Sequence, residues 1–158
     1  MSEAPDPVAR VPQAEPAGRG QRLGAVLVDG VIGIPLALLA LEYTDTLQPL
    51  LQQRPVTLEQ QLLLAAFGWA SFIAIHSYTL VKRGQTIGKY LIGVRIADLE
   101  GGVPPLWRIA VLRYLPFNVL TLFGLLGSLV LLLDPLMICR GDRRCLHDLF
   151  CGTRVLRA

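Results

Sequence analysis

Three long apolar stretches, separated by segments that carry most of the charged side chains, constrain this sequence most strongly. They cover residues 23–41, 62–81 and 106–138. A helix of about 20 apolar residues crosses the ~30 Å hydrocarbon core of a bilayer, and the first two stretches have this length. Only 17% of the residues are charged, whereas soluble globular chains contain about 25%. The sequence therefore predicts an all-α membrane protein with three to four transmembrane or re-entrant helices.

The third stretch is too long for a single span and has two interpretations. In the first, an interfacial helix over residues 105–115 precedes one span over residues 116–138. In the second, the stretch forms a short helical hairpin that bends near Gly124 or Gly127. Both interpretations place a basic tail, residues 139–158, after the last apolar segment.

The distribution of basic residues predicts the orientation in the membrane. Of the 15 Lys and Arg residues, three precede the first stretch, one lies between the first two, six lie from Lys82 to Arg113, and five follow Ile138. Since basic segments stay in the cytoplasm, both termini are expected there, which needs an even number of crossings or a re-entrant third segment. The basic residues form no continuous stripe, so we expect anionic lipid headgroups rather than nucleic acid as partners.

The domain organisation follows from composition. Residues 1–18 are rich in Pro, Ala, Glu and Gln and are predicted to form a disordered arm. Residues 19–158 form one membrane domain. The first apolar stretch follows this long arm and contains Asp29, so it is expected to be a retained span and not a cleaved signal peptide.

Small residues recur along the first stretch at spacings of three and four. They are Gly30, Gly33, Ala37 and Ala40. Such a face allows another helix to approach closely, and so few spans can hardly enclose a pathway alone. We therefore expect a homo-oligomer or a membrane partner. Pro35 predicts a kink or local break in the same helix.

The connection after the second stretch predicts a small cytoplasmic β element. The segment 91–96 is short and contains β-branched residues, and the segment 153–156 is similar in both respects. The two segments are therefore expected to pair as strands. The preceding segment, residues 84–89, resembles a phosphate loop but has the wrong glycine spacing and lacks the Ser or Thr after its lysine. A tight turn with Lys89 directed toward headgroups is the better interpretation.

Ionisable residues inside the apolar stretches are the candidate functional residues. Arg22 and Asp29 are seven positions apart and share a helix face, so Asp29 is expected either to bind a proton or cation or to pair with Arg22 or a neighbouring helix. With cytoplasmic termini, His76 and Asp134 fall at a similar depth to Asp29. The alternative for His76 is a hydrogen-bonded interfacial histidine.

The cysteines suggest neither a disulfide framework nor a metal site. Cys139, Cys145 and Cys151 are separated by five intervening residues each, whereas structural zinc sites use close pairs, and His147 does not complete such a motif. No nucleophile or carboxylate constellation suggests catalysis. The sequence is therefore expected to belong to a non-enzymatic protein without metal or other cofactor.

Three segments in order resemble the RDD family of bacterial membrane proteins. They are QRLGAVLVD (21–29), GQTIGKYLIGVR (84–95) and LHDLFCGTRV (146–155). The resemblance implies a multi-pass protein of the bacterial inner membrane. It also implies that Arg22 and Asp29 are the arginine and first aspartate of the family name, with Asp148 or Asp134 as the second.

The resemblance further implies a role in transport, because cation/proton antiport has been proposed for some members. Our first functional hypothesis is a small transporter or a component of a cation/proton-coupled antiporter. The alternative is a non-transporting membrane scaffold or accessory subunit that binds lipid or a partner protein. In that case Arg22, Asp29 and Asp148 would hold the fold together.

Overall fold

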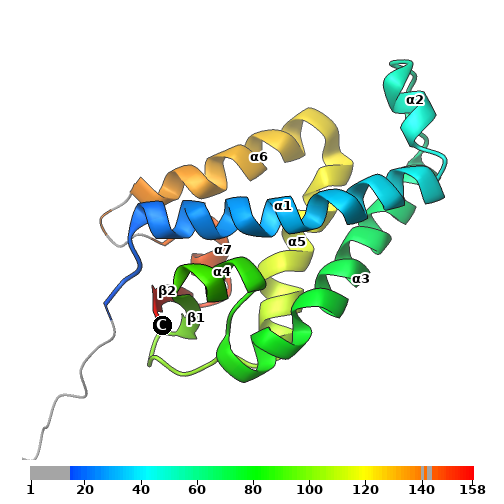
Figure 1. The fold of residues 1–158 in the computed structure, drawn as a ribbon. Coiled ribbons are helices and arrows are strands. Elements are labelled where there is room, and N and C mark those ends of the chain that lie inside the picture. The colour runs from blue at the N-terminus through cyan, green and yellow to red at the C-terminus, as the bar shows by residue number, and fades with distance from the viewer. Residues whose placement is uncertain (1–14, 140, 142–143) are drawn as a thin grey trace, which may run out of the picture.

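The computed structural model describes residues 15–139, 141 and 144–158. Long helices dominate the chain, and the short helices α4 and α7 gather with two strands at one end (Figure 1). In chain order the elements are α1 (Arg19–Tyr43), α2 (Leu47–Leu51), α3 (Leu58–Arg83), α4 (Ile87–Ile92), β1 (Val94–Asp98), the π-helix η1 (Arg108–Tyr114), α5 (Leu115–Leu120), the 3-10 turn η2 (Thr121–Phe123), α6 (Gly124–Leu136), the 3-10 turn η3 (Met137–Cys139), α7 (Leu146–Phe150) and β2 (Thr153–Arg157).

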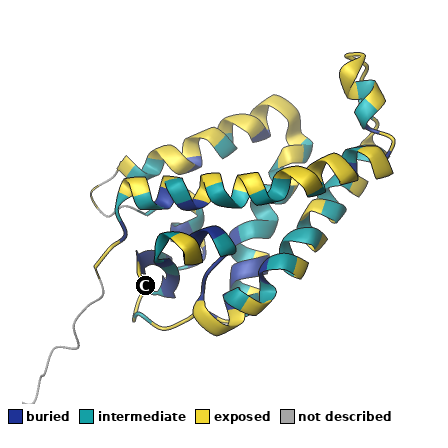
Figure 2. Cartoon of the chain, viewed as in Figure 1, coloured by how far each residue is buried: buried dark blue, intermediate teal, exposed yellow. Residues whose placement is uncertain are grey.

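Three described helical segments are long and apolar enough to cross a membrane. They are Arg19–Tyr43, Leu58–Arg83 and Arg108–Cys139. Most of their leucines and valines are exposed, and the exposed surface follows the long helices in Figure 2. In water such a surface would be unstable, whereas lipid chains solvate it, so the predicted membrane fold is confirmed.

The ends of α3 are determined by local sequence. Thr57 caps its first turn by accepting a hydrogen bond from Gln60 N at 3.2 Å, and the Gln60 side chain returns to Thr57 N at 3.0 Å. Lys82 and Arg83 occupy the last turn, where cations favour the helix dipole. Gly84 then ends the helix in the left-handed conformation, with φ of 65°.

Helix α1 continues through Pro35, so the predicted local break is not observed. Within the described chain, Gly30 and Gly33 of the predicted small-residue face also have no close neighbour from another helix, whereas Ala40 is buried. A Cβ added at Gly30 or Gly33 would have no described atom within 4 Å, apart from the backbone of its own helix. Instead, Gly33, Ala37 and Ala40 line a cavity between α1 and α3.

The third apolar segment is a bent helical hairpin, as the second of the two interpretations predicted. Gly124 has φ of 53° and ψ of −126°, which reverses the chain between α5 and α6 (Figure 1). Leu120 O lies 1.8 Å from where a Cβ of Gly127 would be, so only glycine allows the two arms to approach this closely. Helix α6 has 13 residues and rises about 20 Å, less than the ~30 Å of a full span.

The predicted β element is present, with shifted boundaries. Strands β1 and β2 pair antiparallel in the register Val94↔Arg157 to Asp98↔Thr153. Leu91 and Ile92, predicted to start the strand, instead belong to α4, because the Thr86 hydroxyl caps a short helix by accepting from Lys89 N at 3.3 Å. Gly93 ends that helix with φ of 75°.

The predicted disordered arm, residues 1–18, lies mostly outside the described residues. Its last part is packed against the sheet. Ala17 is fully buried and donates its N–H to Val155 O at 3.0 Å. Residues 15–18, which precede the predicted boundary at residue 19, therefore belong to the packed domain.

The small buried core lies where the sheet meets the helices. One apolar cluster joins Ala17 and Ala25 to Val94 and Val155. A second cluster joins Leu80, Ile96 and Ile109. These two clusters hold the ends of α1, α3 and η1 against β1 and β2, and this arrangement positions the buried charges described next.

Candidate functional site

Ionisable and polar side chains form two buried or half-buried groups in the described part of the chain. The Asp148 cluster comprises Arg22, Arg113, Asp134, His147 and Asp148. The Asp29 cluster comprises Asp29, His76, Thr86, Lys89 and Tyr114. The first group lies beside α7 and the second lies between α1, α3, α4 and η1.

Asp148 is the centre of the first cluster and its side chain is fully buried. It accepts hydrogen bonds from Arg113, from Arg22 Nη1 at 3.2 Å and from Thr153 Oγ1 at 3.3 Å. It also accepts from the backbone N–H of Cys145 at 3.2 Å, because Cys145 is the N-cap residue of α7 and Asp148 lies in the first turn. One carboxylate thus joins α1, η1, α7 and β2.

The charge balance favours an ionised Asp148. Burial, the largest influence, opposes the charged form, but Arg113 and Arg22 more than offset it and hold the pKa of Asp148 below its usual value. Arg22 also donates to Val155 O at 3.1 Å, and Arg113 donates to Thr153 Oγ1 at 2.5 Å. Both guanidinium groups therefore contact the C-terminal strand β2 as well as the Asp148 carboxylate.

His147 connects Arg113 to Asp134. Arg113 Nη2 lies 2.9 Å from His147 Nε2, and since a guanidinium only donates, Nε2 must accept. The ring proton then resides on Nδ1 and is donated to Asp134 Oδ2 at 2.6 Å. Burial and the Arg113 charge lower the pKa of His147, in agreement with this neutral form.

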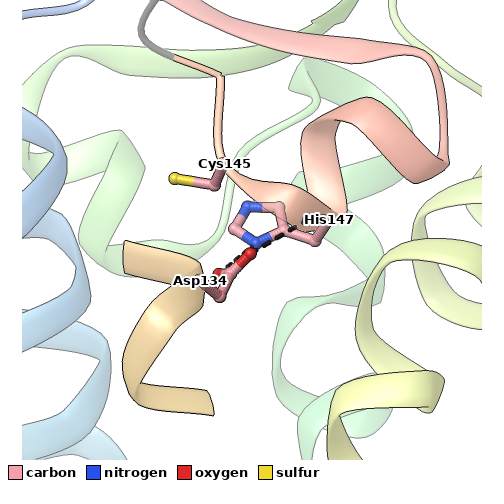
Figure 3. A group of neighbouring side chains, drawn as sticks. All are labelled: Asp134, Cys145 and His147. Atoms are coloured by element: carbon pink, nitrogen blue, oxygen red, sulfur yellow. Dashed lines mark hydrogen bonds and ion pairs between the residues drawn. The ribbon is translucent and has the colours of Figure 1, made fainter. Parts of the chain in front are cut away.

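Asp134, Cys145 and His147 also resemble a metal-ligand set, which the spacing of the cysteines alone did not suggest. Their donor atoms all lie within 4.8 Å of one another (Figure 3). A metal at Nδ1 would move the ring proton to Nε2, where it would face a donor N–H of Arg113. Burial and the nearby Asp148 raise the pKa of the Cys145 thiol to about 11, which disfavours the thiolate that metals bind. The arrangement therefore fits a hydrogen-bonded structural pair better than a metal centre.

Asp29 is held by a different set of donors. Its carboxylate accepts from Thr86 Oγ1 at 2.5 Å and from Gly88 N at 2.7 Å. Lys89 Nζ lies 4.0 Å from Asp29 Oδ2 and 3.4 Å from the Tyr114 hydroxyl. These two donors come from the N-cap and the first turn of α4, so α4 and α1 are joined through this carboxylate.

A cavity of about 540 Å³ lies between α1 and α3 and ends at the Asp29 cluster. Its walls are mostly apolar and include Leu36, Phe67 and Phe72. Asp29 and His76 contribute polar groups at one end, together with Thr86, Lys89 and Tyr114. Such a mostly apolar space with a few convergent polar groups is the usual form of a small-ligand or ion site.

The sequence of this chain matches the model of one known protein family. The model of the RDD family matches residues 16–152. The chain belongs to the RDD family. No curated protein and no solved structure matches the chain.

The match confirms the resemblance inferred from the three sequence segments. It covers every residue of both clusters of this RDD protein and ends just before the strand β2. Of the two candidates for the second aspartate, Asp148 is the one that contacts Arg22. Asp134 binds His147 instead, through its backbone N–H at 3.0 Å and its ring.

Of the alternatives given for Asp29, the structure has the bond to a neighbouring helix, α4. Arg22 turns instead toward Asp148 and the tail strand. The orientation expected for another charge of this RDD protein was wrong. Lys89 does not point toward headgroups. It is only 8% exposed and lies beside Asp29, because α4 folds back against α1 instead of lying on the surface.

The three residues predicted to lie at a similar depth are divided between the two clusters. Asp29 and His76 line the same cavity, and His76 Nδ1 accepts a hydrogen bond from Ile87 N at 3.3 Å. Asp134 belongs to the other cluster. Sequence reasoning did not assign roles to Arg113, Thr86 or His147. For Arg113, the signal was present, since an arginine within an apolar stretch requires a buried partner.

Proposed function

We propose that this RDD protein is a small cation/proton-coupled transporter, or a component of one, and that Asp29 is the carboxylate that binds the proton or cation. The observation that carries the proposal is that Asp29 lines the cavity between α1 and α3 together with His76 and Lys89. Its side chain is 19% exposed, whereas that of Asp148 is fully buried. A carboxylate that an ion can reach is the minimum that such a function needs.

The Asp148 cluster supports the second candidate, a non-transporting scaffold or accessory subunit. Every member has a partner within the chain, and the cluster joins the first span, the hairpin and the tail. Buried networks of this kind often stabilise one arrangement of elements. We therefore assign Arg22, Asp134 and Asp148 to holding the fold, and only Asp29 and His76 among the predicted residues to ion binding.

Asp29→Asn tests the transport function in vesicles that contain the purified protein. The Asn side chain still accepts from Gly88 N–H and its amide can donate to the Thr86 hydroxyl, so the protein should assemble. Internal pH changes driven by gradients of Na⁺, K⁺ or Li⁺ should be lost. The matched control is Asp45→Asn, at an exposed position with φ of 50°, which asparagine tolerates. Unchanged ion-driven pH changes in Asp29→Asn would contradict the proposal and favour the scaffold.

The proposed location is the bacterial inner membrane, with both termini in the cytoplasm. The basic residues at the end of α3 and in the tail support this orientation. A reporter enzyme that is active only in the periplasm, fused after Ala158, should be inactive, and the same reporter fused within α2 should be active. Activity at the C-terminal fusion would reverse the proposed topology.

The proposed partners are anionic lipid headgroups and a second copy of the chain. The open face at Gly30 and Gly33 offers room for another helix, and neither glycine is covered within the described chain. Crosslinking between cysteines placed at position 30 in two copies should give a dimer in membranes. If only monomers form at all protein densities, this surface is not the contact.

A further inference from the structure

A second cavity, of about 340 Å³, lies between α3 and the arm of the hairpin that contains α5 and η2. Three of the residues that line it are polar, although they belong to segments long and apolar enough to cross a membrane. They are Gln61 on α3, Asn118 on α5 and Thr121 on η2. Polar side chains at membrane depth are costly and are therefore candidates for a function, which gives this cavity its interest.

The polar groups around the second cavity offer oxygen atoms to a ligand. Among the residues that the structure describes, none is bonded to the side-chain amide of Asn118. The Asn118 backbone oxygen accepts from Thr121 Oγ1 at 2.6 Å. Gln61 Nε2 donates to Val56 O at 3.1 Å, which leaves the Gln61 side-chain oxygen as an acceptor. Neutral oxygen atoms of this kind replace the hydration shell of monovalent cations in ion-conducting proteins.

The second cavity adjoins the cavity that contains Asp29. Leu64 lines both of them. Gly68 belongs to the wall of the Asp29 cavity and Asn118 to the wall of the second, and a Cβ at Gly68 would lie only 3.6 Å from Asn118 Nδ2. One face of α3 follows both cavities, because the lining residues recur at spacings of three and four. They are Gln61, Leu64, Gly68, Ser71 and Ile75.

Together the two cavities extend across most of the membrane. From Gln61 to His76, which lies beside Asp29, α3 rises about 22 Å, compared with the ~30 Å of the hydrocarbon core. In the proposed topology the start of α3 faces the periplasm. The second cavity therefore lies on the periplasmic side of Asp29, and Gly68 and Asn118 lie where the two cavities meet.

We infer that Gln61, Asn118 and Thr121 form an outer binding site, at which a monovalent cation exchanges part of its water before it reaches Asp29. This inference rests on the proposed function of Asp29. The outer site has dipoles and no carboxylate, so it holds the cation weakly enough to release it. The carboxylate of Asp29 carries the charge that binds the cation more strongly.

Asn118→Leu tests the outer site, because leucine has a similar size but no oxygen or nitrogen in its side chain. In vesicles that contain the purified protein, the initial rate of the pH change driven by Na⁺ or K⁺ should fall about tenfold, since loss of one contact to a charged group has an effect of this size. Equilibrium binding of the same cations in detergent should be unchanged, because the contacts of Asp29 remain. The melting temperature should not fall, since no described hydrogen bond of the amide is lost.

The matched control for this variant is Ser128→Leu. Ser128 is an exposed polar residue in α6, the other arm of the same hairpin, and its hydroxyl bonds only to Gly124 O at 2.9 Å among the described residues. The change removes a polar group at membrane depth, but away from both cavities. It should leave the rate of cation-driven pH change as in the wild type.

Gly68→Leu tests the passage between the cavities and keeps all three polar residues. The position accepts a Cβ, because 3.6 Å to Asn118 Nδ2 is an ordinary contact distance, and the rest of the leucine side chain would fill the junction. The rate should fall as in Asn118→Leu, with equilibrium cation binding unchanged. Ala70→Leu, at an exposed position of α3 that lines neither cavity, introduces the same side chain and should have no effect.

The outcomes distinguish this inference from the function on which it rests. A wild-type rate in Asn118→Leu or in Gly68→Leu, together with loss of the pH change in Asp29→Asn, would overturn the outer site and leave Asp29 as the ion site. A clearly lower melting temperature in Asn118→Leu would show that the amide holds the helices together, and would also overturn it. If the wild type shows no cation-driven pH change, or if Asp29→Asn changes nothing, the proposed function itself fails.

Discussion

Arg22 and Asp148, which are 126 positions apart in the chain, form a buried ion pair with 3.2 Å between Nη1 and Oδ2. The pair joins the first turn of α1 to α7, and Arg113 brings the hairpin to the same carboxylate. The C-terminal tail is thereby a structural part of the membrane domain. Most of the testable consequences concern this connection.

The first prediction is that removing the charge of Asp148 costs more stability than removing that of Arg22. Asp148→Asn should destabilise the protein by about 3–5 kcal/mol, because two buried guanidinium groups lose their counter-charge. Arg22→Gln should cost less, since Arg113 still neutralises Asp148. Thermal unfolding in detergent measures both effects, and the double variant should lose less stability than the two single variants together.

A matched pair of substitutions serves as the control for this cycle. Arg22→Gln combined with Asp29→Asn should be additive, because the structure gives Arg22 and Asp29 different partners. Strong coupling between residues 22 and 29, with none between residues 22 and 148, would contradict the described network.

The second prediction concerns pH. Since burial and Arg113 lower the pKa of His147 below the usual 6.5, the folded protein binds fewer protons than the unfolded chain just below that value. The stability that His147 contributes is therefore present above about pH 6.5 and is lost as the pH falls further. The melting temperature in detergent should fall between pH 7.5 and pH 5, and His147→Asn should flatten this dependence. An unchanged slope in His147→Asn would exclude the histidine as its source.

The third prediction concerns the approach of α4 to α1. A Cβ at Gly88 would lie 2.3 Å from Ala25 O and 2.8 Å from the Asp29 carboxylate. Gly88→Ala should therefore destabilise the protein by about 1–3 kcal/mol, although alanine favours a helix. Gly20→Ala, in the first turn of α1, is the control and should be neutral or stabilising, since nothing described lies within 4 Å of the added Cβ. Equal melting temperatures for the two variants would show that α4 does not pack in this way.

The fourth prediction concerns the tail. Truncation before Cys151 removes β2, and with it the pairing to β1, the Val155 O acceptor of Arg22 and the Thr153 hydroxyl that contacts Arg113. The truncated protein should melt at a clearly lower temperature or fail to accumulate. Arg157→Gln, which removes only an exposed ion pair to Glu15, should have little effect. A truncated protein with wild-type stability would rule out a structural role for the strand.

Features that depend only on residues close together in the chain could be predicted from the sequence. The length of the apolar stretches predicted the membrane segments. The β-branched character of residues 91–96 predicted a strand paired with the tail, and the observed strand is Val94–Asp98. These properties belong to single helices and strands, so hydrophobicity and conformational preference determine them locally. The boundary error at Leu91 and Ile92 arose because the Thr86 cap and Gly93 permit one short helix before the strand.

The partners of the buried charges were decided only by the tertiary structure. A shared helix face suggested Arg22 for Asp29, yet the first turn of α4 supplies a hydroxyl and an N–H that satisfy this carboxylate. Arg22 is then free to reach Asp148, which no local pattern connects to it. Which charge meets which depends on how α4, the bent hairpin and the tail strand fold against α1. The sequence alone therefore determined that the charges need partners, because burial without them is too costly, whereas the packing of distant segments determined which partners they found.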